Sequence, residues 1–220
     1  EIGDVIGLFG CLCNKRYICL SFLEGSELCE LDNCNLIQVK PPGFRNDMQT
    51  IAFGTHKGRC VQVTNSSVNN VRFVKTNEES ILWSDNEILC GDVNETGVVI
   101  GTANCELVVF DENSKWNMSL GQWIELVSIS DRFVCAIVEC NKLAVCNRLN
   151  QAIIASIDIG YGLRTSMLII DSEILIGCYN ELFHVYLDSN SKIVKEDISG
   201  DVIVHRKDKG YSISGSSPWM

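Results

Sequence analysis

Three histidines are the first residues to consider for chemistry, because imidazole groups act as general bases and as metal ligands near neutral pH. They are His56, His184 and His205. His56 stands beside Lys57 in a polar stretch, whereas the other two lie within or after apolar runs. None has metal-site spacing such as His-x-x-x-His, and no nucleophile elbow, phosphate loop or dinucleotide fingerprint occurs. The sequence therefore predicts no catalytic residue, no metal ligand and no cofactor, so we expect no enzyme.

Twelve cysteines are the second chemical feature of the chain. No C-x-x-C pair occurs, and many of the cysteines interrupt apolar runs such as "RFVCAIV" and "LAVCN". Free cysteine behaves as a small buried hydrophobe. We therefore expect free core thiols in a reducing compartment, and an intracellular protein, cytoplasmic or nuclear. The alternative is a disulfide-bonded, secreted or lumenal protein, which three N-x-S/T sequons at Asn65, Asn94 and Asn117 favour.

The charge balance bears on the kind of partner. The chain has 28 acidic and 18 basic residues and a net charge of −10. Nucleic-acid affinity comes mainly from neutralising phosphates, so we expect no direct DNA or RNA binding, and a partner with a basic surface or peptide. No apolar run is long enough for a membrane helix. The first residues, "EIGDVIGLFG", contain no charged-then-apolar leader, so we expect no signal peptide and a processed chain or a piece of a longer one.

An internal repeat organises the elements that would position any site. Five stretches share one form, which is an apolar strand, a short polar or glycine-containing turn, and a second strand with a bulky or apolar end. They are "CLSFLEGSELCELD", "TIAFGTHKGRCVQVT", "VVIGTANCELVVFD", "FVCAIVECNKLAVCN" and "ILIGCYNELFHVYL". Their end residues are Leu31, Val63, Phe110, Cys146 and Tyr186. In three copies a glycine, Gly54, Gly101 or Gly177, precedes the end residue at the same offset. The mean repeat is about 39 residues, which suits one four-stranded unit per copy.

Two further strands fit between consecutive copies. Segments such as "WNMSL" and "AIIASI" follow the end residues, and segments such as "EILCG" and "IELVSI" precede the next copy. The second copy lacks such a preceding strand, because only "PPGFRND" stands there and prolines disfavour a central strand. No sustained helical periodicity is present, so an all-β protein is expected.

Four short strands in each repeat are typical of a β-propeller. The sequence resembles the WD-repeat β-propeller family over nearly its whole length. The similarity is carried by the apolar-Gly-Thr strand ends at Gly54 and Gly101, the related turn at Gly177, and the apolar-Asp strand ends at 31–32 and 110–111. "YSISGSS" resembles an inner strand of that family. The chain departs from the family in having no Trp-Asp and no Gly-His dipeptide, and Lys57, Asn104 or Asn180 replaces the usual turn aspartate.

The expected fold is one propeller domain over residues 1–220, with about five complete blades and part of a sixth. The blades are expected at 1–40, 41–80, 81–121, 122–160, 161–199 and, in part, 200–220. Ring closure has three alternatives: a fragment of a six- or seven-blade protein, a blade completed by strands from another chain, or short closing strands not recognised in the sequence. Glycines and end residues are expected to serve packing.

The function expected is a non-enzymatic scaffold that binds partner peptides or subunits of a multiprotein complex through face loops and blade edges. Candidate partner-binding residues are His56, Lys57, Trp83, Asn104, Tyr179 and Asn180. The turn residues among them are expected on one face, because they share an offset in the repeat. The alternative function is a secreted or lumenal propeller that binds or processes glycans. A third is a nucleic-acid-associated component that acts through a basic partner.

Overall fold

The computed structural model describes residues 5–13, 15–66, 70–74, 81–83, 86–111, 114–139, 141–160, 164–170, 173–178, 182–187, 193–197, 201–207 and 210–216. Their strands form five four-stranded antiparallel sheets and one two-stranded sheet, which confirms the all-β prediction. Across these ranges there is no helix of the length and apolar character that a membrane crossing requires.

Each four-stranded sheet is a meander of strands that are consecutive in the chain, and we call the sheets blades A to E. Blade A contains β1 (Gly7–Cys13), β2 (Lys15–Phe22), β3 (Gly25–Asp32) and β4 (Asn35–Val39). Blade B contains β5 (Thr50–His56), β6 (Arg59–Thr64), β7 (Val71–Phe73) and β8 (Ile81–Trp83). Blade C contains β9 (Ile88–Asn94), β10 (Gly97–Thr102), β11 (Glu106–Phe110) and β12 (Lys115–Ser119). Blade D contains β13 (Ile124–Ile129), β14 (Phe133–Val138), β15 (Lys142–Asn147) and β16 (Ala152–Asp158). Blade E contains β17 (Arg164–Ile170), β18 (Glu173–Cys178), β19 (Leu182–Leu187) and β20 (Ile193–Asp197), and β21 (Asp201–Lys207) and β22 (Gly210–Ser216) form the terminal hairpin.

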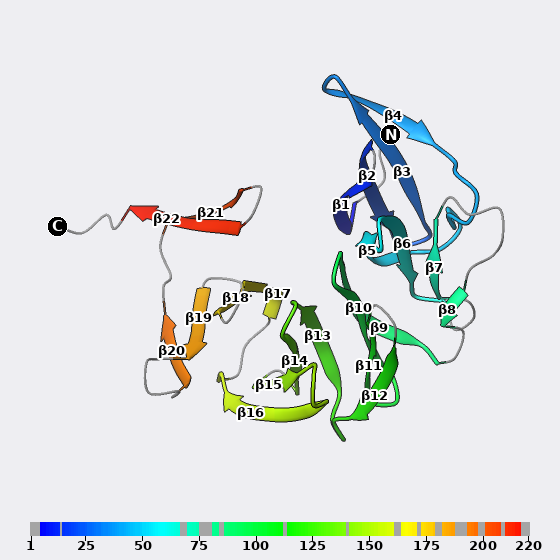
Figure 1. Ribbon diagram of the computed structural model, residues 1–220. Helices are drawn as coiled ribbons and strands as arrows, with labels where there is room; N and C mark the ends of the chain where they lie inside the picture. Colours follow the sequence, from blue (N-terminus) through cyan, green and yellow to red (C-terminus); the bar gives the residue numbers. More distant parts are fainter. Residues whose placement is uncertain are drawn as a thin grey trace.

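The blades follow one another around an arc, with the first strand of each blade innermost (Figure 1). Contacts between β1 and β5, β5 and β9, β9 and β13, and β13 and β17 join consecutive blades. The arc is open between blade A and the terminal hairpin (Figure 1). This arrangement is a β-propeller with an incomplete ring, as the repeat predicts.

The hydrophobic core lies between blades rather than in one centre. Separate clusters fill the A–B, B–C, C–D and D–E interfaces. Middle strands such as β10 and β14 are buried on both faces, which explains why they appear in the sequence as continuous apolar runs. The outer strand β16 is mostly exposed or half-buried, because no further strand covers its edge.

The described cysteines belong to this core. Eight have described side chains, all are free thiols, and six of these are buried. Burial raises the pKa of Cys90 to about 12 and that of Cys146 to about 11. Because the reactive form of cysteine is the thiolate, these thiols are chemically inert at neutral pH. For these eight residues the expectation of free thiols is confirmed.

The second blade corrects the repeat alignment. Gly54 lies in β5, the first strand of blade B, whereas Gly101 and Gly177 lie in the second strands β10 and β18. Val63 likewise ends a second strand, and the other end residues lie in third strands. The strand predicted to be missing is therefore β5 itself. Gly54 and Gly101 each lie near the end of a strand where two blades approach closely, and this shared packing produced the false alignment.

Asp92 joins blades C and D through a half-buried carboxylate. Its Oδ2 accepts hydrogen bonds from the Ile129 N–H and the Ser128 hydroxyl, both at 3.0 Å. Burial raises its pKa above the usual 3.8, and these two hydrogen bonds oppose part of that rise. The folded protein therefore holds a proton at a pH where the unfolded chain has already released it.

We expect this raised pKa to make stability fall as the pH rises. The contribution of Asp92 is fully present below about pH 4 and is lost as the pH passes through the raised value, because the folded state binds more protons there. The Asp92→Asn variant keeps an acceptor oxygen and removes the charge. As the pH rises through the raised pKa, the stability of the variant should therefore increase relative to that of the wild type. Urea unfolding at a series of pH values measures this difference, and parallel pH profiles for the two proteins would contradict the prediction.

Candidate functional site

The meander gives each blade two ends that differ in which strands their loops connect. Turns between first and second strands and between third and fourth strands lie at one end, which we call the turn face. Turns between second and third strands lie at the other end together with the connections between blades, and we call this end the linker face. Residues 57–58 and 95–96 belong to the turn face, and residues 103–105 belong to the linker face.

The structure separates the residues that the sequence predicts to lie on one face. Lys57 is exposed on the turn face, between β5 and β6. Asn104 is exposed on the linker face, between β10 and β11. The expected shared face is therefore wrong for this pair, because the offset was counted from glycines in non-equivalent strands. Trp83 ends the outer strand β8, and Tyr179 and Asn180 lie outside the described residues.

His56 ends β5 directly behind the turn face, and its side chain is only 2% exposed. Burial, and next the charge of Lys57, lower its pKa below the usual 6.5, so the imidazole is neutral at physiological pH. Its Nδ1 has no hydrogen-bond partner in the described part of the chain. A partner cannot touch this side chain unless the surrounding turns move, so its position suits packing between blades.

A hollow of about 600 Å³ opens on the turn face, where blades B, C and D meet. It is lined by turn residues from these three blades, namely Lys57, Glu95, Thr96, Asp111, Asp131, Arg148 and Leu149. Of these, only Lys57 was among the predicted site residues. We call this depression the turn-face hollow.

The wall of the hollow is a partly buried ion pair between blades. Arg148, with a side chain 9% exposed, donates from Nε to Asp111 Oδ1 at 2.9 Å, and its Nη2 contacts the same oxygen. The guanidinium also donates to Thr96 Oγ1 and the Thr96 carbonyl, each at 2.9 Å, and to the Ser130 carbonyl. Asp111 accepts a further bond from Trp116 Nε1 at 2.9 Å. The Arg148 guanidinium is thus paired within the protein and offers a ligand no free positive charge.

The sequence contained a signal for this pair that the repeat analysis did not use. Asp111 follows the end residue Phe110 of one copy, and Arg148 comes shortly after Cys146, the end residue of the next copy. Both therefore lie in turns between third and fourth strands of adjacent blades. Opposite charges at this position of consecutive copies predict a contact across the blade interface.

The remaining lining groups can recognise a ligand. Asp131 is exposed, and Glu95 is exposed with Oε1 accepting from the Gly58 N–H at 2.8 Å. Leu149, which is 92% exposed, lines the same hollow and supplies an apolar rim. Carboxylates next to an apolar rim suit a basic side chain with a hydrophobic neighbour. No group of three or more metal-ligating side chains occurs in the described ranges.

The sequon at Asn94 stabilises the β9–β10 turn, whose residues 95 and 96 line the turn-face hollow. Its amide donates to the Ile129 carbonyl at 2.5 Å, and its carbonyl oxygen accepts from the Thr96 N–H at 3.0 Å and hydroxyl at 2.7 Å. The asparagine and threonine of the sequon thus have a structural use, since they fix the β9–β10 turn against blade D.

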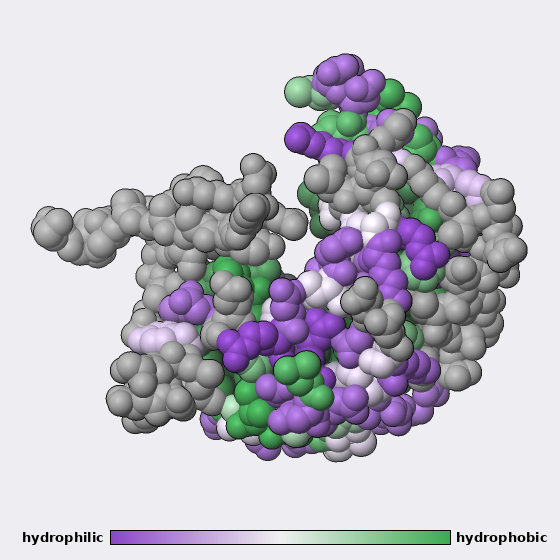
Figure 2. All heavy atoms as spheres, viewed as in Figure 1, coloured by the Kyte–Doolittle hydropathy of each residue, from purple (hydrophilic) through white to green (hydrophobic). Residues whose placement is uncertain are grey.

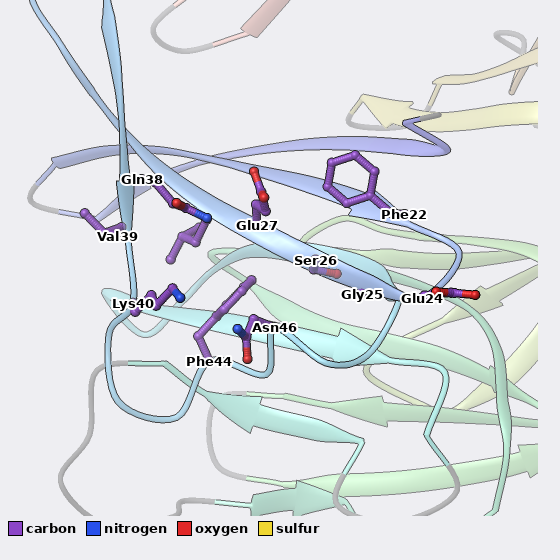
Figure 3. A pocket seen from close by; sticks show the side chains of 11 residues that line it. Phe22, Glu24, Gly25, Ser26, Glu27, Gln38, Val39, Lys40, Phe44 and Asn46 are labelled. Carbon is purple, nitrogen blue, oxygen red and sulfur yellow. The ribbon is translucent and has the colours of Figure 1, made fainter. Parts of the chain in front are cut away.

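A second hollow, of about 410 Å³, lies on blade A beside the segment that leads to blade B. Figure 3 shows Glu24 and Phe22 at one end of it, and Lys40 and Phe44 at the other. Its charged groups therefore do not converge on one point. This hollow is therefore the weaker candidate for a binding site.

The comparisons with known proteins agree with this fold. The model of the family described as the RSE1/DDB1/CPSF1 second β-propeller matches residues 9–194. Among solved structures, the β-propeller domain of Myceliophteria thermophila Cps50 (Swd1) superposes with a TM-score of 0.64 and 9% sequence identity. The match covers 90% of this chain and 72% of that one, and at such low identity it shows the fold alone. No curated protein gives a significant match. The finer WD-repeat assignment stays a prediction.

Proposed function

Because the chain belongs to the RSE1/DDB1/CPSF1 second β-propeller family, we propose that it is a non-enzymatic interaction scaffold in a multiprotein complex and that its turn-face hollow binds a basic segment of a partner. The observation that carries the proposal is the exposed carboxylate of Asp131 beside the almost fully exposed Leu149. The partly buried Arg148–Asp111 pair holds the blade C and blade D sides of this surface together. Rigid turns that place charge beside an apolar group are suited to recognition.

The charge of the protein supports the choice of a basic partner. The net charge is −10, and the lining arginine is already neutralised by Asp111. Complementary charge speeds the encounter of two proteins and excludes acidic competitors. The same charge opposes direct contact with nucleic acid. We place the protein inside the cell, in the cytoplasm or nucleus, because the eight described cysteines are free thiols.

The lining groups contain no arrangement for catalysis. Histidine, the usual general base, is represented near the hollow by His56, which is buried behind it. Enzymatic turnover is therefore not part of the proposal. As a second mode of assembly, a partner donates a strand to the open arc between blade A and the terminal hairpin.

The test is co-purification from the native cell at about 0.1 M salt, where charge pairs at the surface are only partly screened. We expect a stoichiometric partner with the wild-type chain, and a loss of about tenfold or more of that partner with the double variant Asp131→Asn, Leu149→Ser. The matched control is Asp32→Asn, which removes an exposed carboxylate at the end of β3 in blade A. Recovery of the chain alone and monomeric, or equal losses for the double variant and the control, would overturn the proposal.

A further inference from the structure

The outer strand of blade D has one edge with no neighbouring strand. β16 is the last strand of the β13–β16 sheet, so the backbone N–H and C=O groups along one side have no strand to pair with. It is seven residues long and contains no proline and no lysine, and its only charged residue is Asp158 at its end. Natural proteins normally protect such an edge with charge, proline, shortness or a β-bulge, and of these β16 has only a shift of register against β15 at Ile154.

Apolar side chains cover this edge. Ile153 and Ile154 are 48% and 47% exposed, and Leu149, in the turn just before β16, is 92% exposed. Figure 2 shows hydrophobic surface where β16 lies in Figure 1, bordered by hydrophilic residues. Leu149 also lines the turn-face hollow, so the apolar stripe and the acidic hollow form one continuous surface.

The other outer strands are better protected. β12 begins with Lys115 and buries Trp116, β8 has three residues, and β20 contains lysine and two carboxylates in its five residues. β4 has exposed Leu36 and Ile37, but it is shorter than β16 and ends next to Lys40. The hollow that it borders contains this lysine as well as two glutamates. β16 is therefore the longest of these outer strands, and the turn before it lines the acidic turn-face hollow.

We propose that an extended segment of a partner protein pairs with β16 as a fifth strand of blade D. Its backbone hydrogen-bonds to the free edge, its apolar side chains cover Leu149, Ile153 and Ile154, and a basic residue at one end enters the turn-face hollow. The inference rests on the proposed scaffold function and specifies the edge used and the form of the partner. Main-chain pairing supplies affinity in strand addition, and alternating side chains supply specificity.

Charge argues against a second copy of the chain as the occupant. Antiparallel pairing of two β16 strands would set the Asp131 end of one copy against the Asp158 end of the other. Both ends carry exposed carboxylates, and the whole chain carries a net charge of −10. A basic partner segment has the opposite charge at the hollow and meets no such repulsion.

The test uses a fluorescein-labelled peptide, Thr-Val-Thr-Val-Thr-Val-Lys, whose single lysine at the carboxyl end favours antiparallel pairing, because β16 begins at the turn-face hollow. Two further peptides are N-methylated, one on its three valines and the other on its three threonines. Alternate N–H groups of an added strand point at β16, so only one of the two methylated peptides is expected to lose binding, by at least tenfold. Ile154→Lys should weaken the unmodified peptide by tenfold, and Ile37→Lys on β4, the matched control, should change it less than twofold.

The outcomes distinguish strand pairing with β16 from binding to the turn-face hollow. Asp131→Asn should weaken peptide binding several-fold at low salt. If only Asp131→Asn has an effect, β16 pairing is wrong while the proposed hollow survives. If only Ile154→Lys has an effect, strand addition stands and the hollow proposal fails. No peptide binding, equal behaviour of the two methylated peptides, or a dimer of the chain that Ile154→Lys dissociates in sedimentation would overturn the inference.

Discussion

Replacing Gly54 with alanine is expected to lower the free energy of unfolding by about 3 kcal/mol, at the upper end of the usual range for overpacking. A Cβ at this position would lie 2.3 Å from the Val93 carbonyl oxygen and 3.0 Å from Val93 Cβ. Val93 is in β9, so the added methyl group would separate the innermost strands of blades B and C. A backbone oxygen held in a sheet cannot move aside as a flexible side chain does. The shift of the urea midpoint measures the loss.

Gly10→Ala is the matched control, because Gly10 also lies in a first strand, β1. Its added Cβ would meet only the Tyr17 carbonyl oxygen, at 4.0 Å. We expect the free energy of unfolding to change by about 1 kcal/mol or less. The change can be an increase, because alanine restricts the unfolded chain more than glycine does. Equal losses for the two variants would show that close packing between blades is not the reason for glycine at position 54.

Arg148→Met is expected to cost about 3 kcal/mol of stability, the scale on which a buried ion pair loses one partner. The variant keeps most of the length of the side chain and leaves the carboxylate of Asp111, with a side chain 21% exposed, without its cation. The carbonyls of Thr96 and Ser130 lose a donor at the same time. The cost should appear in urea unfolding followed by circular dichroism, with blades C and D affected together.

A double-mutant cycle identifies the source of that cost. With Asp111→Asn already in place, Arg148→Met should cost clearly less, because no carboxylate is then left unpaired. Arg132→Met in the neighbouring turn is the control, since Arg132 is exposed and its guanidinium lies 5.2 Å from the Phe133 ring centroid. It should change stability by about 0.5 kcal/mol or less. An additive cycle would mean that the pair contributes by packing rather than by charge.

Strand number and order could be predicted from the sequence because each blade repeats one pattern of buried and exposed residues. Segments such as "IELVSI" and "AIIASI" became the first and last strands of blade D, as expected. The error in blade B arose because a glycine marks close packing, against backbone or side chain, in whichever strand it occurs. Gly54 meets Val93, and Gly101 would meet the Cys90 sulfur at 2.7 Å and Ile124 at 2.8 Å. Residue type alone does not distinguish these two situations.

The candidate site was harder to predict than the fold. Lys57 was found because it lies in a strand-connecting turn of the repeat, whereas Asp131 and Leu149 belong to turns outside the repeated stretches that were compared. The hollow depends on which turns of three blades meet, and a one-strand error in the repeat assigns a turn to the opposite face. Arg148 and Asp111 are a whole blade apart in sequence, so their contact is visible only after the blades have been correctly aligned.

The meander has a consequence for how this chain can be divided. All connections between blades lie on the linker face, so a break there, for example at 120–123 between β12 and β13, leaves every sheet whole. The two pieces would still share the apolar cluster between blades C and D and the link from Arg148 to Asp111. A break in a turn-face loop instead splits a sheet into separate strands. The fold thus has natural points for fragment complementation, and they lie on the face opposite the turn-face hollow.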